Sequence, residues 1–131
     1  MINSQRDRSG FTIIELLIAI AIIGVLALAV IPSLLRARNE AQVRSLQVHS
    51  KNVQTAAVAW LASNSDRTSA DAVAAWSPCL TALSIDGYAT PPAPAPATEC
   101  TVAPAPGGRV DAIVVGDING TIMTFINGGI Q

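Results

Sequence analysis

Aromatic and charged side chains are scarce in this chain of 131 residues, of which they make up 4% and 13%. With eight prolines and nine glycines as well, little material remains for a large hydrophobic core. The length allows one small domain plus an anchor. These scarcities argue against a sizeable catalytic domain.

Groups of reactive side chains are also missing. The chain has one histidine, His49, and two cysteines, Cys79 and Cys100. No Ser/His/Asp or Cys/His set, carboxylate pair, phosphate-binding glycine loop or metal-ligand cluster is recognisable. A lone histidine on a helix is far more often a surface or packing residue than a ligand or a base. The sequence therefore predicts no enzyme, no cofactor and no bound metal.

Charge is unevenly distributed along the chain. Up to Lys51 there are six basic and three acidic side chains, and from Asn52 onward two basic and six acidic ones, which together give the net charge of −1. This balance is unlike that of a nucleic-acid-binding protein, and the acidic second half argues against direct contact with DNA.

The hydrophobic residues are concentrated in one run. Phe11–Ile31 is a stretch of 21 residues broken only by Thr12, Glu15 and Gly24. As a helix it would be about 31 Å long, which matches the hydrocarbon core of a bilayer. The preceding residues 1–10 carry two arginines and one aspartate. Their positive balance predicts a cytoplasmic N-terminus, with the rest of the chain outside the cytoplasm.

Glu15 does not fit a simple membrane anchor. No small-residue cleavage site ends the apolar run, which continues through Pro32. An uncleaved signal anchor would therefore explain every feature of this segment except Glu15. A charge in the middle of a membrane helix costs about 2.5–3.5 kcal/mol, less near an interface, and normally has a partner. Cleavage between Gly10 and Phe11 would supply one, because the new amino group is largely cationic at neutral pH. That amine could meet Glu15 of its own helix or of a neighbouring subunit.

The segment from Ser9 to Leu17, SGFTIIELL, followed by an apolar helix, resembles the class III signal of type IV prepilins and pseudopilins. The resemblance implies cleavage after Gly10 by a prepilin peptidase and methylation of the Phe11 amino group. It also implies that Glu15 pairs with the N-terminus of an adjacent subunit during filament growth.

The resemblance extends over about residues 9–60. It implies a helical filament of pilin subunits, assembly machinery in the inner membrane, and a chain held in that membrane until it joins the filament. Gly24 and Pro32 match positions at which many pilins carry helix-weakening residues. Inside a helix, glycine is less favourable than alanine by up to about 1 kcal/mol, and proline costs about 3 kcal/mol. The family usually has its cysteine pair around the C-terminal edge of the sheet, whereas here no cysteine follows the last predicted strand.

Beyond the membrane segment, residues 32–63 are expected to form an amphipathic continuation of the helix. Apolar residues recur there at near-helical spacing, namely Leu46, Val53, Ala57 and Trp60, with Val43 and Leu61 beside them. This stripe either packs on the head or contacts neighbouring subunits. On the remaining surface, Arg36, Arg38 and Arg44 either touch lipid headgroups before assembly or are simply solvated.

The head is expected to comprise residues 64–131. Thr68 reads as the N-cap of a short helix to about Trp76. Residues 77–108 look irregular, and the proline-rich segments 91–96 and 103–106 favour an extended, polyproline-like loop. Two cysteines in an exported domain predict one disulfide, Cys79–Cys100, which would contribute about 3 kcal/mol.

The C-terminal end carries the clearest strand signal. Asn119-Gly120 separates Ile113–Ile118 from Thr121–Ile126, which predicts a hairpin with a type I′ turn and Val114 opposite Phe125. Both faces are largely apolar, so one should cover the helix and the other should meet loops, a further strand or another subunit. Asp117 to Gly120 resembles part of a calcium loop without its downstream glutamate, and residues 119–121 form a glycosylation sequon, but a turn explains both. The expected fold is α+β, with a short antiparallel sheet of two to four strands.

Three functional hypotheses remain. The first is a pilin-like subunit of a surface filament that serves motility, adhesion or DNA uptake. The second is a type II secretion pseudopilin that forms a short periplasmic pseudopilus. The third, a membrane-anchored enzyme or binding module, has no supporting residues.

Overall fold

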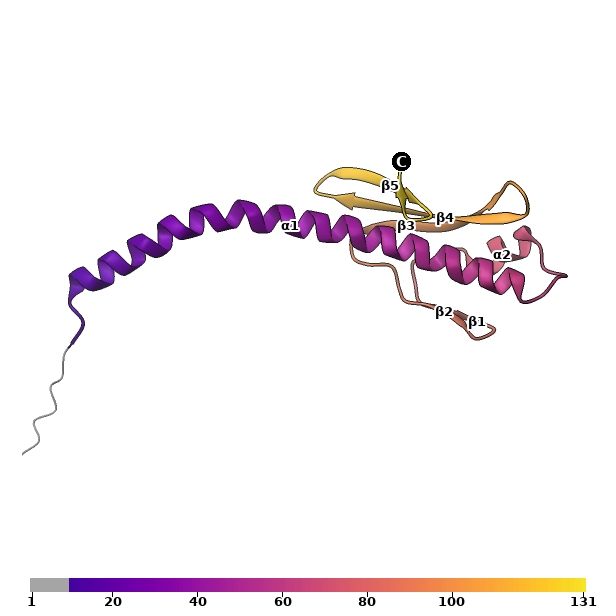
Figure 1. The fold of residues 1–131 in the computed structure, drawn as a ribbon, viewed down its shortest axis with the longest axis horizontal. Coiled ribbons are helices and arrows are strands. Elements are labelled where there is room, and N and C mark those ends of the chain that lie inside the picture. The colour runs from indigo at the N-terminus through magenta and orange to yellow at the C-terminus, as the bar shows by residue number, and fades with distance from the viewer. Residues whose placement is uncertain (1–9) are drawn as a thin grey trace, which may run out of the picture. The chain divides into compact units, whose positions relative to one another are not determined.

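The computed structural model describes residues 10–131 and divides the chain into two compact units, Met1–Ala37 and Arg38–Gln131. Cleavage after Gly10 would make residues 1–10 a prepilin leader peptide, and all of this predicted leader except Gly10 lies outside the described residues. Because the units are separate bodies, each is described by itself (Figure 1).

Helix α1, Ile13–Ala62, begins in the first unit and ends in the second. Its end confirms the prediction of a helix to about Ser63. The helix is continuous through Gly24 and Pro32, and the Ser33 hydroxyl donates to the Val30 carbonyl at 2.8 Å, next to the proline. It is the helix among the described residues that is long and apolar enough to cross a membrane. Whether Gly24 and Pro32 weaken it stays a prediction.

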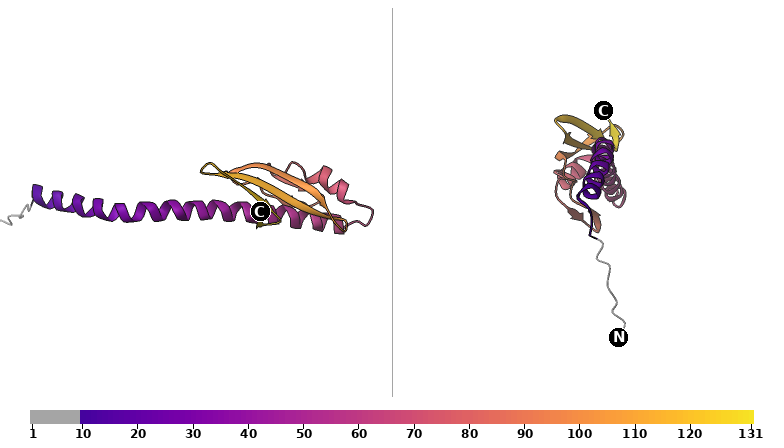
Figure 2. Two further views of the ribbon diagram at one scale, coloured as in Figure 1. Left: turned by 90° about the horizontal axis from the view of Figure 1, so that it is seen from above. Right: turned by 90° about the vertical axis from the view of Figure 1, so that its left-hand side faces the viewer.

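The second unit has a second helix and two antiparallel sheets (Figures 1 and 2). Helix α2 is Ser69–Trp76. Strands β1, Leu83–Ile85, and β2, Tyr88–Thr90, form a two-stranded sheet. The second sheet has the order β3-β4-β5-β6, with the bounds Ala97–Ala105, Arg109–Ile118, Thr121–Ile126 and Gly129–Ile130. The predicted α+β fold class is confirmed. The main sheet has four strands, the upper end of the predicted range of two to four.

The core of this unit lies between α1 and the inner face of the main sheet. The predicted stripe of Leu46, Val53, Ala57 and Trp60 is buried, and Val43 and Leu61 pack partly buried beside it. Opposite it lie buried side chains of α2 and the sheet, among them Trp76, Val110, Val114 and Phe125. The stripe is therefore the face that packs on the head.

Helix α2 begins where its capping residues predict. The side chain of Thr68 accepts a hydrogen bond from the Asp71 amide, and the Asp71 carboxylate accepts from the Thr68 amide and hydroxyl at 2.7 Å. These two hydrogen bonds hold the pKa of Asp71 below its ordinary value. The reciprocal arrangement is a capping box, which satisfies amides that a helix start leaves unpaired.

The register of the C-terminal hairpin is confirmed, and β5 has the predicted bounds, but β4 begins at Arg109 and not at the predicted Ile113. Val114 pairs with Phe125 and Ile113 with Ile126, and the φ angles of Asn119 and Gly120 are 55° and 81°, as a type I′ turn requires. Val114 and Phe125 face the core. The opposite face is half-buried to exposed, and Ile122 on it is 74% exposed.

The expectation that residues 77–108 are irregular is wrong in part. The stretch 91–94 has no regular structure, but β1, β2 and the whole of β3 fall in this range. Residues 103–105, predicted as polyproline-like loop, pair with Asp111, Val110 and Arg109 of β4. Pro104 is tolerated because β3 is an edge strand, which bonds to a neighbour on one side only.

Candidate functional site

The N-terminus of α1 positions Glu15, the acid predicted to act in assembly. The Thr12 amide and hydroxyl donate to Glu15 Oε2 at 3.0 and 3.1 Å, and the Glu15 amide donates to Thr12 Oγ1 at 3.3 Å. These contacts form a second capping box, so the first turn of the helix fixes the direction of the carboxylate. A helix N-terminus also favours a negative charge in its first turn.

The carboxylate keeps capacity for a further partner. All hydrogen bonds that it accepts within the described residues reach Oε2, which leaves Oε1 available. Between Gly10 and Arg36, Glu15 is the one charged residue in the sequence. This segment therefore supplies no cation for Oε1, whereas a new chain end at Phe11 or another molecule could supply one.

The predicted cleavage point lies just before the helix. Residues 10–12 carry no regular secondary structure, Gly10 is exposed, and the Phe11 side chain is 89% exposed. A Cβ atom added at Gly10 would meet no other atom within 4 Å. The Gly10–Phe11 peptide is thus accessible, and the glycine is not needed for packing.

The first part of α1 is apolar on all sides. Large hydrophobic side chains from Ile13 to Leu35 are more than half exposed in the isolated chain. A helix that is hydrophobic all round belongs in a membrane or in the core of an assembly. This segment therefore requires lipid or other subunits to cover it.

The predicted disulfide is present and lies next to the one histidine. Cys79 and Cys100 are bonded and buried. His49 is 3% exposed, and its Nε2 lies 3.2 Å from the Cys79 carbonyl oxygen and 3.7 Å from Cys100 Sγ. Burial lowers the pKa of His49, and the hydrogen bond with the Cys79 carbonyl opposes this shift. Its place in the core makes His49 a packing residue.

The calcium and glycosylation readings of residues 117–121 gain no support beyond the turn. Asp117 Oδ1 accepts from the Gly120 amide at 2.7 Å, and Asn119 Nδ2 donates to Asn39 Oδ1 at 2.8 Å. Within residues 10–131, no group of three or more His, Cys, Asp or Glu side chains could hold a metal ion.

One cluster was missed by the sequence reasoning. Asp86 Oδ2 accepts hydrogen bonds from Trp60 Nε1 at 2.8 Å and from the Arg67 guanidinium at 2.6 Å. The same guanidinium stacks 4.0 Å from the centre of the Trp60 ring. The cluster ties the β1–β2 turn to the end of α1. Its one sequence signal was the Asp86-Gly87 pair, which is typical of a two-residue hairpin turn.

The fold and this N-terminus define a class of protein. It has one long helix, whose apolar first part begins at an accessible peptide and carries a single acid, and a small head with a disulfide. Residues 5–31 match a family described as the prokaryotic N-terminal methylation motif. No curated protein and no solved structure matches the chain. Residues 5–31 thus carry the N-terminal methylation motif, the class III signal of type IV pilins and pseudopilins, and this motif supports a precursor of the pilin or pseudopilin type.

Proposed function

We propose that this chain is a pilin-like structural subunit that polymerises through its N-terminal helix into a surface filament. In this proposal a prepilin peptidase cleaves after Gly10 and methylates the amino group of Phe11. Motility, adhesion or DNA uptake then belongs to the filament, and the subunit itself catalyses no reaction. The observation that carries the proposal is the methylation motif at residues 5–31, with Glu15 as the one acid of the apolar segment Phe11–Ile31.

The geometry at Glu15 supports an ionic contact between subunits. Cleavage would create an ammonium group on Phe11, the residue next to Thr12, whose amide already binds Oε2. The free Oε1 can accept from the ammonium group of a neighbouring subunit. In a medium of low dielectric this attraction is strong, and it offsets the cost of holding a charge away from water. A methylated amine stays basic, so methylation preserves the cation.

The exposed apolar surface of the first unit supports the same conclusion. Before assembly, lipid of the inner membrane would cover it, with the head outside the cytoplasm. In the filament, the helices of other subunits would replace the lipid. Because one apolar surface is exchanged for another, the ion pair at Glu15 would determine which position along the neighbouring helix is preferred.

Analysis of sheared surface filaments tests this proposal. Their main polypeptide should lack Met1–Gly10 and begin at a methylated Phe11 by N-terminal sequencing and mass spectrometry. A mature chain that begins at Met1 would contradict it. Processed chains confined to short periplasmic fibres, together with loss of protein secretion on deletion, would favour the pseudopilus instead.

A further inference from the structure

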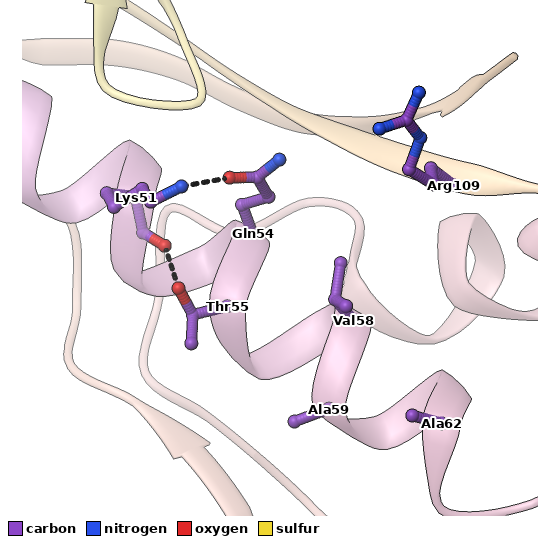
Figure 3. Close-up of a pocket in the computed structure, with 7 residues that line it drawn as sticks. All are labelled: Lys51, Gln54, Thr55, Val58, Ala59, Ala62 and Arg109. Carbon is purple, nitrogen blue, oxygen red and sulfur yellow. Dashed lines mark hydrogen bonds between the residues drawn. The ribbon is translucent and has the colours of Figure 1, made fainter.

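An open groove runs along the exposed side of α1 in the second unit, and two cations flank it. It has a volume of about 420 Å³, and its lining comes from α1 and from the start of β4. Figure 3 shows Lys51 on the helix and Arg109 on the strand, with Val58 pointing into the space between the two elements. Val58 is 40% exposed, and Ala59 and Ala62 continue its apolar floor.

Within residues 10–131, neither Lys51 nor Arg109 has an anionic partner. The ion pair found among residues 10–131 is Arg67–Asp86. Lys51 Nζ donates to Gln54 Oε1 at 2.8 Å, and Arg109 Nε donates to the Pro106 carbonyl at 3.4 Å. A lysine has three N–H donors and an arginine has five, so both retain donors for a carboxylate.

A complementary surface lies on the outer face of the main sheet. Glu99 of β3 pairs with Val115 of β4, and Asp117 of β4 pairs with Ile122 of β5. Because alternate residues share a face, these four side chains form one patch, with two acids beside two apolar residues. Glu99, Asp117 and Ile122 are exposed. We call this set the acidic patch.

The groove and the acidic patch of one head cannot meet. Arg109 and Asp117 are eight residues apart on β4, which corresponds to about 26 Å along a strand. A contact between the two surfaces must therefore join two copies of the chain.

We propose that the groove of one head binds the acidic patch of a second copy, with Lys51 and Arg109 next to Glu99 and Asp117, and Val58 against Ile122. The two surfaces match in the number of charges, in their opposite sign, and in having apolar residues beside the charges. They differ from each other, so the contact is heterologous and each copy keeps one unused surface at either end of a stack. Such a contact repeats without limit, which suits an extended filament. This inference rests on the proposed function.

Cysteine cross-linking in the full-length chain tests the contact. The double variant Val58→Cys/Ile122→Cys should, after mild oxidation of sheared filaments, give a ladder of dimers, trimers and larger species on a denaturing gel. Each single variant should give none, because a heterologous contact places the two different positions together. The native disulfide is buried and should not take part.

Charge reversal separates a specific contact from chance collision. In the cysteine background, Lys51→Glu with Arg109→Glu should reduce the ladder at least tenfold, and adding Glu99→Lys should restore part of it. Arg44→Glu is the matched control, since Arg44 is an exposed cation of α1 outside this groove, and it should leave the ladder unchanged.

The outcomes are distinguishable. Normal filaments without a ladder would overturn the proposed contact and leave the filament function intact. Dimers from a single variant would also overturn it, since they indicate a symmetric contact. If the wild-type chain is found in no filament, the proposed function fails, and the contact fails with it.

Discussion

The residues before Arg38 and those after it use their apolar side chains in opposite ways. In the first unit, large hydrophobic side chains from Phe11 to Leu35 are exposed, whereas in the second unit Leu46, Val53 and Phe125 are fully buried. The head therefore has its own core, and the first part of the helix must find its partners in lipid or in other subunits. Changes in the first unit should act on processing and assembly, and changes in the second on the stability of the head.

Blocking cleavage is the strongest way to test the role of the first unit. Gly10→Val should leave the precursor uncut and filaments absent, because a branched side chain at Gly10 would obstruct the approach of a peptidase to the backbone. Mass spectrometry of the membrane fraction would detect the precursor with Met1–Gly10 still attached.

Gly24→Ala is the matched control for this variant. It also adds a Cβ atom to an exposed glycine with no neighbour within 4 Å, but far from the predicted cut. Its precursor should be processed normally. A Gly10→Val chain that is trimmed at the usual rate would refute the predicted cleavage point.

Removing the acid of the first unit should separate processing from polymerisation. Glu15→Ala should be cleaved and inserted, since the loss of a charge eases insertion, but its filament yield should fall at least tenfold. The yield is measured as chain in the sheared fraction relative to chain in the membrane. Glu40→Ala removes an exposed carboxylate of α1 beyond the apolar segment and should assemble normally. A normal yield from Glu15→Ala would exclude the ion pair between subunits.

Breaking the disulfide should affect the head and leave the first unit unaffected. Cys79→Ser should reduce the free energy of unfolding of the head by about 2–5 kcal/mol, because the unfolded chain loses a cross-link. Thermal unfolding and limited proteolysis measure this loss, and mass spectrometry should still find the leader removed. Cys79→Ser/Cys100→Ser should behave like the single variant. Failure of processing in both would contradict the independence of the two units.

The sequence predicted those elements whose signal lies within one continuous segment. The apolar run, the stripe of α1, the capping residue of α2 and the hairpin at Asn119-Gly120 each combine a periodic pattern with a recognisable boundary. All four were confirmed. The N-terminal methylation motif is local in the same sense, because its signal lies wholly within residues 5–31. The motif can therefore be recognised from this segment alone.

Two other hairpins carry a similar turn but were missed. Asp86-Gly87 and Asn127-Gly128 both have positive φ angles at both positions, yet their flanking strands are only two or three residues long on at least one side. Strands of two or three residues are too short to show the alternation of apolar and polar residues that identifies a strand. The turn at Asn127-Gly128 is held from elsewhere in the chain, because the Gly128 amide donates to the Ser50 hydroxyl at 3.2 Å.

Strand β3 was missed because its structure depends on its neighbour. Its sequence, ATECTVAPA, is rich in alanine and has a proline, which are poor strand formers. The strand is stabilised instead by its pairing with β4 and by the burial of Cys100 and Val102 on its inner face. The burial of the polar residues His49 and Ser50 likewise could not be predicted from the helix alone, because their partners lie elsewhere in the head. The Ser50 hydroxyl, for example, donates to the Ala112 carbonyl of β4 at 2.8 Å.

A smaller effect, on the pH dependence of stability, should arise from the head alone. Burial holds the pKa of His49 below its ordinary value in the folded head, so the unfolded chain binds a proton at a higher pH. The free energy of unfolding should therefore decrease as the pH falls below about 6.5, the ordinary value for histidine. His49→Gln should flatten the pH dependence in this window, while the capping carboxylate of Asp71, with its lowered pKa, loses its contribution only at more acidic pH. Thermal unfolding of the detergent-solubilised chain between about pH 5 and pH 8 measures both curves. If the two curves were parallel, proton uptake by His49 would not contribute to acid destabilisation of the head.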